Sequence, residues 1–242
     1  MSEIVMEAVK VEKVLGSGPA QIRALKGVSL ALRGGELTLL MGPSGSGKTT
    51  LLSILGCMLT PTEGTIRVRG ASIDGKGPED LAKLRRENIG YVFQSYHLFP
   101  TLSATDNVRL ALDVRDESGR DAKARAREAL ARVGLAQKTA NYPKQLSGGE
   151  QQRVAIARAV VGEPSVILAD EPTAALDTEN GKAIMGILAG IAKDPQRGVL
   201  VVTHDPRLVP YADRIVHIED GNIVNEEVRN NSRSLRDMLG KA

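Results

Sequence analysis

The chain has 242 residues, of which 42% are hydrophobic and 25% are charged, and its formal net charge is only +3. This balance is typical of a folded globular protein and excludes a disordered chain. The mild charge, with Lys and Arg scattered along the sequence, argues against nucleic acid as a partner.

The sequence also bears on where the protein works. No apolar run approaches the roughly 18 residues that cross a bilayer as a helix. Residues 1–4 lack the basic start and apolar stretch of a secretory signal. The single cysteine, Cys57, excludes an internal disulfide framework and is interpreted as a buried small residue in a reducing compartment. We therefore expect a cytoplasmic protein.

The first elements are predicted to be strands. Residues 5–14 alternate apolar and charged side chains, which is the period of a half-exposed strand. A Gly-Ser-Gly-Pro break follows at 16–19. Further strands are predicted at 28–32 and 36–41, with a Gly-Gly turn between them.

Residues 42–49 read Gly-Pro-Ser-Gly-Ser-Gly-Lys-Thr and lie between the last of these strands and a helix-like segment at 50–55. In this context G-x-x-x-x-G-K-[ST] predicts a phosphate-binding loop rather than a plain glycine turn. Glycines let several backbone N–H groups converge on an anion, and the helix adds the positive end of its dipole. We expect Lys48 to reach the outer phosphates and the Thr49 hydroxyl to ligate Mg²⁺.

The middle of the chain changes from mixed to helical. After a turn at 61–64, a strand at 65–68, a helix at 78–86 and a strand at 89–93 are predicted. The pattern is then helical over 103–133, with a charged break at 113–119, and again over 149–161. A helical block of roughly 95–162 therefore interrupts an α/β core.

Strand and helix patterns alternate again in the last third. The segments are strands at 166–170, 199–203, 214–219 and 223–226, a helix at 179–192, and a short amphipathic helix at 232–239. The apolar strand at 166–170 ends in Asp170, followed by Glu171. At a strand end Asp170 can hold Mg²⁺, and Glu171 can polarise an attacking water. Such a strand more often ends in plain acidic turn residues, but the phosphate loop upstream favours the catalytic interpretation.

Residues 146–151 read Leu-Ser-Gly-Gly-Glu-Gln and open the helix predicted at 149–161. Ser147 has the position of an N-cap, and two glycines make a helix start that an anion can approach. Read alone, the segment is a turn and a cap. Together with the two motifs above, it resembles the LSGGQ signature of the ATP-binding cassette (ABC) family, with Glu150 in the last place.

The resemblance covers roughly residues 4–228 and implies further roles. Gln94 resembles the Q-loop glutamine that contacts Mg²⁺ and water and senses the membrane partner. His204 resembles the switch histidine that contacts the γ-phosphate, and Asp177 the D-loop residue that meets the opposite subunit. A lone glutamine or histidine after a strand is usually structural, but the order and spacing of the motifs favour these roles.

The family implies an α/β fold. It is a P-loop NTPase (ABC ATPase) core with an N-terminal antiparallel β-subdomain and an inserted α-helical subdomain. We expect one domain over 1–242, with the core at 1–94 and 163–242 and the helical subdomain at about 95–162. The expected cofactors are ATP and Mg²⁺. The family's aromatic residue that stacks on adenine is missing, and Leu15 is assigned to that position, so base selectivity should be weak.

The predicted site residues fall into five groups. They are Glu171, His204 and Gln94 for catalysis; Leu15, Gly42, Pro43, Ser44, Gly45, Ser46, Gly47, Lys48, Thr49 and Thr50 for ATP; Leu146, Ser147, Gly148, Gly149 and Glu150 for the signature acting in trans; Asp177 for the D-loop; and Thr49, Gln94 and Asp170 for the metal.

The resemblance also implies partners. A second copy of the chain is expected to pair head to tail in the presence of ATP, and an integral membrane permease subunit is expected to contact about residues 94–108. In that segment Tyr96, Leu98 and Phe99 either pack into the core or form a groove for a short helix of the permease. The protein would then lie peripherally on the cytoplasmic face of the membrane, and no nucleic acid is expected.

Three short segments of the sequence indicate which group within the ABC family the chain resembles. Residues 54–57, 95–100 and 168–173 resemble the group that serves macrolide export, lipoprotein release and glycolipid export. An importer or cell-division cassette shares the same chemistry and stays an alternative. A DNA-repair relative would carry a long coiled coil, yet Lys48 and Ser147 are only 99 positions apart (147 minus 48). A generic P-loop kinase is opposed by the signature.

Overall fold

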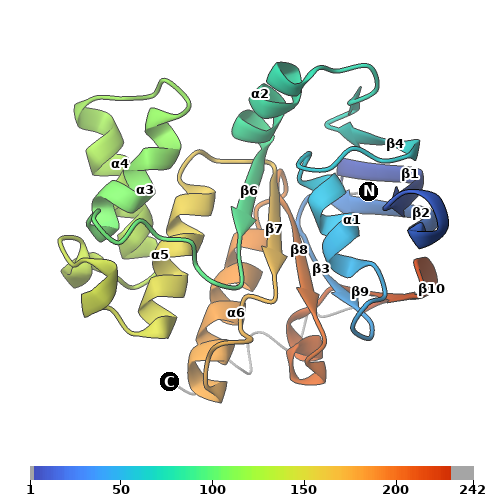
Figure 1. Cartoon of the computed structure of the whole chain (residues 1–242). Helices are drawn as coiled ribbons and strands as arrows, with labels where there is room; N and C mark the ends of the chain where they lie inside the picture. The colour runs from blue at the N-terminus through green and yellow to red at the C-terminus, as the bar shows by residue number, and fades with distance from the viewer. Residues whose placement is uncertain (1–2, 230–242) are drawn as a thin grey trace.

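The computed structural model describes residues 3–229 (Figure 1). The strands are β1 (Ile4–Leu15), β2 (Ile22–Arg33), β3 (Glu36–Met41), β4 (Glu63–Val68), β5 (Ala71–Ser72), β6 (Ile89–Val92), β7 (Val166–Asp170), β8 (Gly198–Thr203), β9 (Arg214–Glu219) and β10 (Asn222–Val228). The α-helices are α1 (Lys48–Leu55), α2 (Pro78–Asn88), α3 (Ala104–Asp113), α4 (Arg120–Arg132), α5 (Gly148–Val160) and α6 (Thr178–Ala192). Short 3-10 helices are η1 (Gly18–Ala20), η2 (Ala136–Lys138), η3 (Pro143–Gln145) and η4 (Pro206–Tyr211).

The larger sheet determines where the site lies. Its strand order is β10-β9-β3-β8-β7-β6, and all neighbours are parallel except β9 and β10. Met41 pairs with Thr203, and Asp170 pairs with Val202. The carboxyl ends of β3, β8, β7 and β6 therefore meet at one edge, where ligands bind in open α/β sheets.

The smaller sheet is antiparallel, in the order β2-β1-β4-β5. Strand β2 begins six positions earlier than the sequence pattern predicts, at Ile22 instead of 28. Its first half is mostly exposed and ends at Gly27, so it carries no clear alternation, but it is held by pairing with the end of β1. The two-residue strand β5 was not predicted, because a strand that short has no period.

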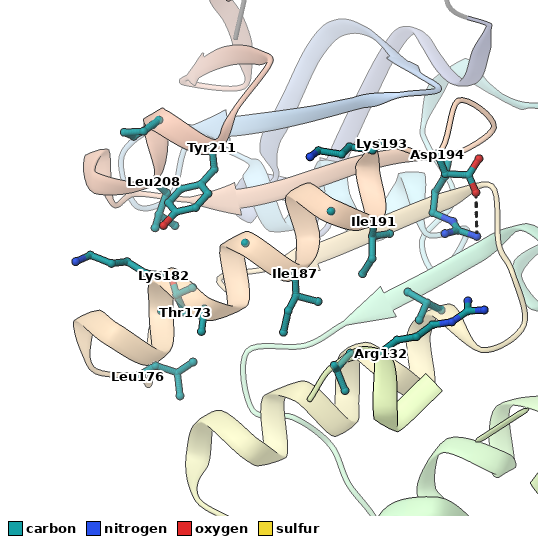
Figure 2. A pocket seen from close by; sticks show the side chains of 18 of the residues that line it. Arg132, Thr173, Leu176, Lys182, Ile187, Ile191, Lys193, Asp194, Leu208 and Tyr211 are labelled. Atoms are coloured by element: carbon teal, nitrogen blue, oxygen red, sulfur yellow. Dashed lines mark ion pairs between the residues drawn. The ribbon is translucent and has the colours of Figure 1, made fainter. Parts of the chain in front are cut away.

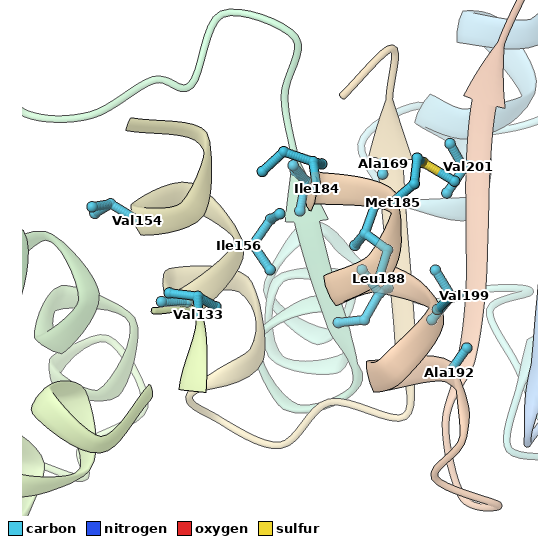
Figure 3. Close-up of a cluster of buried hydrophobic side chains, with 14 of the residues drawn as sticks. Val133, Val154, Ile156, Ala169, Ile184, Met185, Leu188, Ala192, Val199 and Val201 are labelled. Atoms are coloured by element: carbon cyan, nitrogen blue, oxygen red, sulfur yellow. The ribbon is translucent and has the colours of Figure 1, made fainter. Parts of the chain in front are cut away.

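Two apolar layers cover the larger sheet. Alternate residues of each central strand face opposite sides, so Val199 and Val201 join one cluster while Leu200 and Val202 join the other. The first cluster lies under α6, α5 and the other helices of the helical block; Figure 3 shows Met185 and Leu188 of α6 beside Val199 and Val201 of β8. The second cluster fills the space between the two sheets around α1.

The helical block contains α3, α4 and α5, and α3 packs on both of the others. The break predicted at 113–119 separates α3 from α4. Strand β6 joins the block to the sheet through Gly90, where an added Cβ would lie 2.2 Å from the carbonyl oxygen of Ala159. The helix predicted at 232–239 lies outside the described residues. Within residues 3–229, no helix has the length and apolar content needed to span a membrane.

Candidate active site

The phosphate loop connects β3 to α1. Gly45 and Gly47 have φ of 79° and 100°, in the left-handed region that favours glycine. A Cβ at Gly47 would lie 2.6 Å from the carbonyl oxygen of Ala24. The loop is held from the other side by the β9–β10 turn, where Gly221 N donates to the carbonyl oxygen of Ser46 at 3.0 Å. The glycines are therefore required by the backbone path.

The loop has the chemistry of an anion cradle. The first backbone N–H groups of α1 have no partner within the helix and point toward the loop. The Ser46 hydroxyl is buried and has no hydrogen-bond partner among residues 3–229. Lys48 Nζ donates to the carbonyl oxygens of Gly42 and Pro43, each at 2.7 Å. An unpaired hydroxyl, free amides and an ammonium together suit a phosphate group.

One positive and two negative side chains lie close together here. Burial lowers the pKa of Lys48, and the nearby charges of Glu171 and Asp170 act against this. Burial likewise raises the pKa of Asp170, reinforced by the Glu171 charge and opposed by Lys48. Because the charge of Glu171 acts on both Lys48 and Asp170, and these two act on each other, the structure brings the three side chains together.

Glu171 and His204 form a direct contact from neighbouring strand ends. His204 Nδ1 lies 2.7 Å from Glu171 Oε1, and since a carboxylate only accepts, Nδ1 donates. The Glu171 side chain is 16% exposed and the His204 side chain 71%. Glu171 has a φ of 45°, and its N–H donates to the carbonyl oxygen of Val202 at 3.0 Å. The backbone of β8 thus anchors an unusual conformation that places the carboxylate beside the imidazole.

The candidate metal ligands come from three elements. Asp170 is the last residue of β7, and Gln94 follows the end of β6, the strand beside β7. Thr49 lies in the first turn of α1. Gln94 and Thr49 are exposed. Among the described residues, no three His, Cys, Asp or Glu side chains gather as a metal site. One carboxylate with a hydroxyl and an amide suits Mg²⁺, which binds with few protein ligands and completes its shell with water and phosphate oxygens.

The signature segment has a different setting. Ser147 is exposed and caps α5, and its hydroxyl accepts from Glu150 N while the Glu150 carboxylate accepts from Ser147 N at 2.8 Å. Gly148 and Gly149 permit close packing: a Cβ at Gly149 would lie 2.5 Å from Asn180 Oδ1. Leu146 is buried in the core.

No hydrogen bond or ion pair within residues 3–229 joins 146–150 to the phosphate loop. In Figure 1, α5 and α1 lie on opposite sides of β6 and β7. The structure therefore brings the loop, Asp170, Glu171 and His204 together, and it leaves the signature as a separate exposed helix start.

The remaining predicted residues lie at the margins. Leu15 is 38% exposed at the end of β1. Asp177 is the N-cap of α6, and its side chain accepts from Asn180 N at 2.9 Å. The backbone bond from Asn180 is the main cause that lowers the pKa of Asp177.

Two polar residues of α5 were not predicted. Gln152 is fully buried and donates to the carbonyl oxygen of Pro172, next to Glu171, at 2.9 Å. Arg158 donates to the carbonyl oxygens of Tyr96 and His97 at 2.8 and 2.5 Å, and burial lowers its pKa. A polar residue on a helix normally indicates a solvent-facing side, so the sequence carried no signal for either contact.

Residues 94–108 were expected either to pack into the core or to form a surface for a permease helix, and the structure shows both a packed and an exposed side chain there. Leu98 packs against the helical core, and Phe99 is 51% exposed. Asn107 is fully buried and holds the turn: its amide accepts from Phe99 N and donates to the carbonyl oxygens of Phe99, Leu102 and Ser103. Phe99 is therefore presented to solvent on a loop that Asn107 holds by hydrogen bonds.

The chain is similar to known proteins in both sequence and fold. The family described as ABC transporter matches residues 25–174. The macrolide export ATP-binding/permease protein MacB of Salmonella paratyphi A is 46% identical over 220 residues, which is 91% of this chain and 34% of that protein. MacB of Agrobacterium fabrum is 43% identical over 234 residues, or 97% of this chain and 36% of that protein. The chain thus spans about a third of the length of these curated relatives.

A solved structure agrees with the fold. The ATP-binding cassette MJ0796, a dimer in a post-hydrolysis state bound to ADP and phosphate, superposes with a TM-score of 0.84 at 41% identity. The match covers 92% of this chain and 98% of that one. This likeness confirms the fold class expected from the sequence. The roles of single residues and the boundaries of the subdomains stay predictions.

Proposed function

We propose that this chain, which belongs to the ABC transporter family, binds and hydrolyses ATP in a site completed by a second copy of itself. The observation that carries the proposal is the convergence of Lys48, Asp170, Glu171 and His204 at one sheet edge, while the Ser147 helix start stays exposed elsewhere. Each chain would supply the chemistry of one site and the cap of the other.

Each residue's part follows from its position. Lys48 and the loop amides would bind the β- and γ-phosphates, and the desolvated surroundings of Lys48 strengthen that attraction. Thr49, Asp170 and Gln94 would hold Mg²⁺, which when bound neutralises phosphate charge.

Glu171 would accept a proton from the attacking water. Its contact with His204 keeps the carboxylate pointed in one direction, and the exposed side of the imidazole is available to the γ-phosphate. Asp177 and the signature residues, from Leu146 to Glu150, would meet the opposite subunit.

The transport role rests on the named relatives. Because the chain is similar to about a third of each macrolide export ATP-binding/permease protein, we propose that it drives export through a separate permease and lies peripherally at the cytoplasmic face of the membrane. We also propose that residues 95–162 form an inserted helical subdomain that carries the permease contact.

The ATPase proposal is tested with Glu171→Gln. Hydrolysis should fall by roughly 10²-fold or more, while ATP binding persists and the chain becomes dimeric with ATP in light scattering. Glu79→Gln, an exposed glutamate on α2, is the control and should behave as the unchanged protein. Near-normal turnover in Glu171→Gln, or no ATP-dependent dimer, would count against the proposal.

The permease contact is tested with Phe99→Ala. Val114→Ala is a matched control, since Phe99 and Val114 are 51% and 50% exposed. Only Phe99→Ala should reduce co-purification with the membrane subunit, while both variants keep the basal ATPase activity. Equal losses in the two variants, or none, would contradict a docking role for residues 94–108.

A further inference from the structure

A groove of about 1520 Å³ runs along the outer face of α6, away from the phosphate loop. The 3-10 helix η4 forms one wall, and the end of α5 with residues 163–165 forms the other. Figure 2 shows Leu208 and Tyr211 on one side of α6 and Ile187 and Ile191 on the other. None of the predicted ATP, catalytic or metal residues lines it, although Asp177 lies at one end.

The groove has an apolar floor that the described residues leave partly uncovered. Leu176, Ile187, Ile191 and Tyr211 each pack inward against the helical core but are only half-buried. Apolar side chains of this size lose stabilisation for as long as their outer faces stay in water. The floor therefore suits an apolar occupant.

Two glycines in α6 indicate what kind of occupant fits. At both Gly186 and Gly190, an added Cβ would meet nothing within 4 Å. Each glycine destabilises the helix relative to alanine, and no contact within residues 3–229 requires it. Small residues one turn apart leave room for another helix to approach the backbone of α6 closely.

The described chain ends at the wall of this groove. Arg229 N donates to the carbonyl oxygen of Asp213 at 2.7 Å, and Arg229 Nη1 donates to the carbonyl oxygen of Val209, in η4, at 2.6 Å. Thirteen residues follow (242 minus 229). Extended chain covers roughly 3.3 Å per residue, whereas α6, with 15 residues, is about 22 Å long. A segment of 13 residues is therefore long enough to span the groove from Arg229.

The sequence of that segment matches the floor. Leu235, Met238 and Leu239 are spaced i, i+3 and i+4, which places them on one face of a helix. Arg233 and Arg236 would face solvent. We propose that residues 232–239 of the same chain form a helix that docks along α6, with this apolar stripe against Ile187 and Ile191 and over the two glycines.

Docking is tested by disulfide trapping with the full chain. Ile187→Cys with Met238→Cys is oxidised, and Glu79→Cys with Met238→Cys is the control pair, because Glu79 is exposed on α2. The native Cys57 is buried and does not interfere. Docking predicts a disulfide within one chain, at a rate independent of protein concentration and on the order of tenfold faster than in the control.

Two outcomes of the disulfide trapping would overturn the proposal. Covalent dimers alone would show that a second copy occupies the groove, and equal rates for the two pairs would show that the segment does not dock. Ile187→Cys alters the floor of the groove, so a second measurement, amide hydrogen exchange, uses variants in which the floor is unchanged. Leu235→Ser with Met238→Ser should speed amide hydrogen exchange at 186–191 several-fold, whereas the matched Arg233→Ser with Arg236→Ser should not. Equal exchange in both variants would again overturn it.

Discussion

The phosphate-loop region and the signature region are both helix starts with glycines and a hydroxyl residue, yet they are built differently. Around the loop, strands bring a buried Lys48 next to Asp170 and Glu171. At the signature, Ser147 is exposed and its bonds stay within its own helix start. Burial makes charges act strongly on one another, whereas exposure leaves a surface free for another molecule. The first region is suited to chemistry and the second to recognition.

The largest effect on ATP hydrolysis is expected from a change in the phosphate loop. Lys48→Met removes the desolvated cation that faces the phosphates, so ATP hydrolysis should fall by roughly 10²-fold or more. The rise in melting temperature on adding ATP should also disappear, because that rise measures binding to the folded state. Lys193→Met, an exposed lysine at the end of α6, should change neither property. Unchanged nucleotide binding in Lys48→Met would show that the loop does not bind the phosphates.

A mixture of two inactive chains tests whether the regions act across subunits. Ser147→Arg should block the signature, and Lys48→Met the loop. In a mixed dimer one site keeps both an intact loop and an intact signature. If half of the dimers are mixed and one of their two sites works, activity should recover to about a quarter of the unchanged protein's.

The control for this experiment is a mixture of Lys48→Met with Glu171→Gln. Both changes lie in the same region, so each site of a mixed dimer keeps one defect and no activity should return. ATPase activity that returns in the control mixture, or that fails to return in the test mixture, would contradict a site formed by the loop of one subunit and the signature of the other.

A smaller effect is expected at Leu15, on the outer edge of the loop region. Its aliphatic side chain can cover a base but lacks aromatic stacking, so ATP, GTP and ITP should be hydrolysed at similar rates. Leu15→Tyr should tighten ATP binding by up to about tenfold, the equivalent of ~1.4 kcal/mol. Titration calorimetry with the three nucleotides checks both statements, and strong preference for ATP in the unchanged protein would contradict the first.

The smallest effect is expected at Glu150, in the signature. The hydrogen bond from Ser147 N–H is the main cause that holds its pKa below the ordinary value. Its contribution to stability is therefore complete above the ordinary carboxylate pKa of about 4.3 and is lost as the pH falls through the lower folded-state value.

Glu150→Gln keeps the capping hydrogen bond but removes the charge at the helix start. The variant should lose at most about 1 kcal/mol of unfolding free energy at neutral pH, and its stability should vary less with pH in the acid range. Urea unfolding measured at a series of pH values checks this. An identical acid dependence in both proteins would contradict the assigned role of the carboxylate.

The sequence predicted the loop region better than its surroundings. Residues 42–49, Asp170 and Glu171 are read from local patterns, because a strand followed by a glycine loop or by acids has few other meanings. The parallel register then brings them together without further information. Strand and helix bounds were also recovered closely where periodicity was strong, as in β9 and α6.

What the sequence could not predict are contacts between residues far apart in the chain. The bond from Gln152 to Pro172 and the clamp of Asn107 on 99–103 join a polar side chain to backbone carbonyls. Carbonyl groups are present at every residue, so no spacing in the sequence marks these partners. The exposure of Phe99 beside the half-buried Leu98 also depends on tertiary packing rather than on pattern.

The two bonds from Arg158 give α5 a mechanical property. They tie the backbone at Tyr96 and His97 to one end of the helix, while Ser147 caps the other end. A helix of 13 residues is a rod about 20 Å long that transmits force with little bending. A load applied at Phe99 would be passed along α5 to its serine end, which lies at the surface proposed to meet a second copy of the chain.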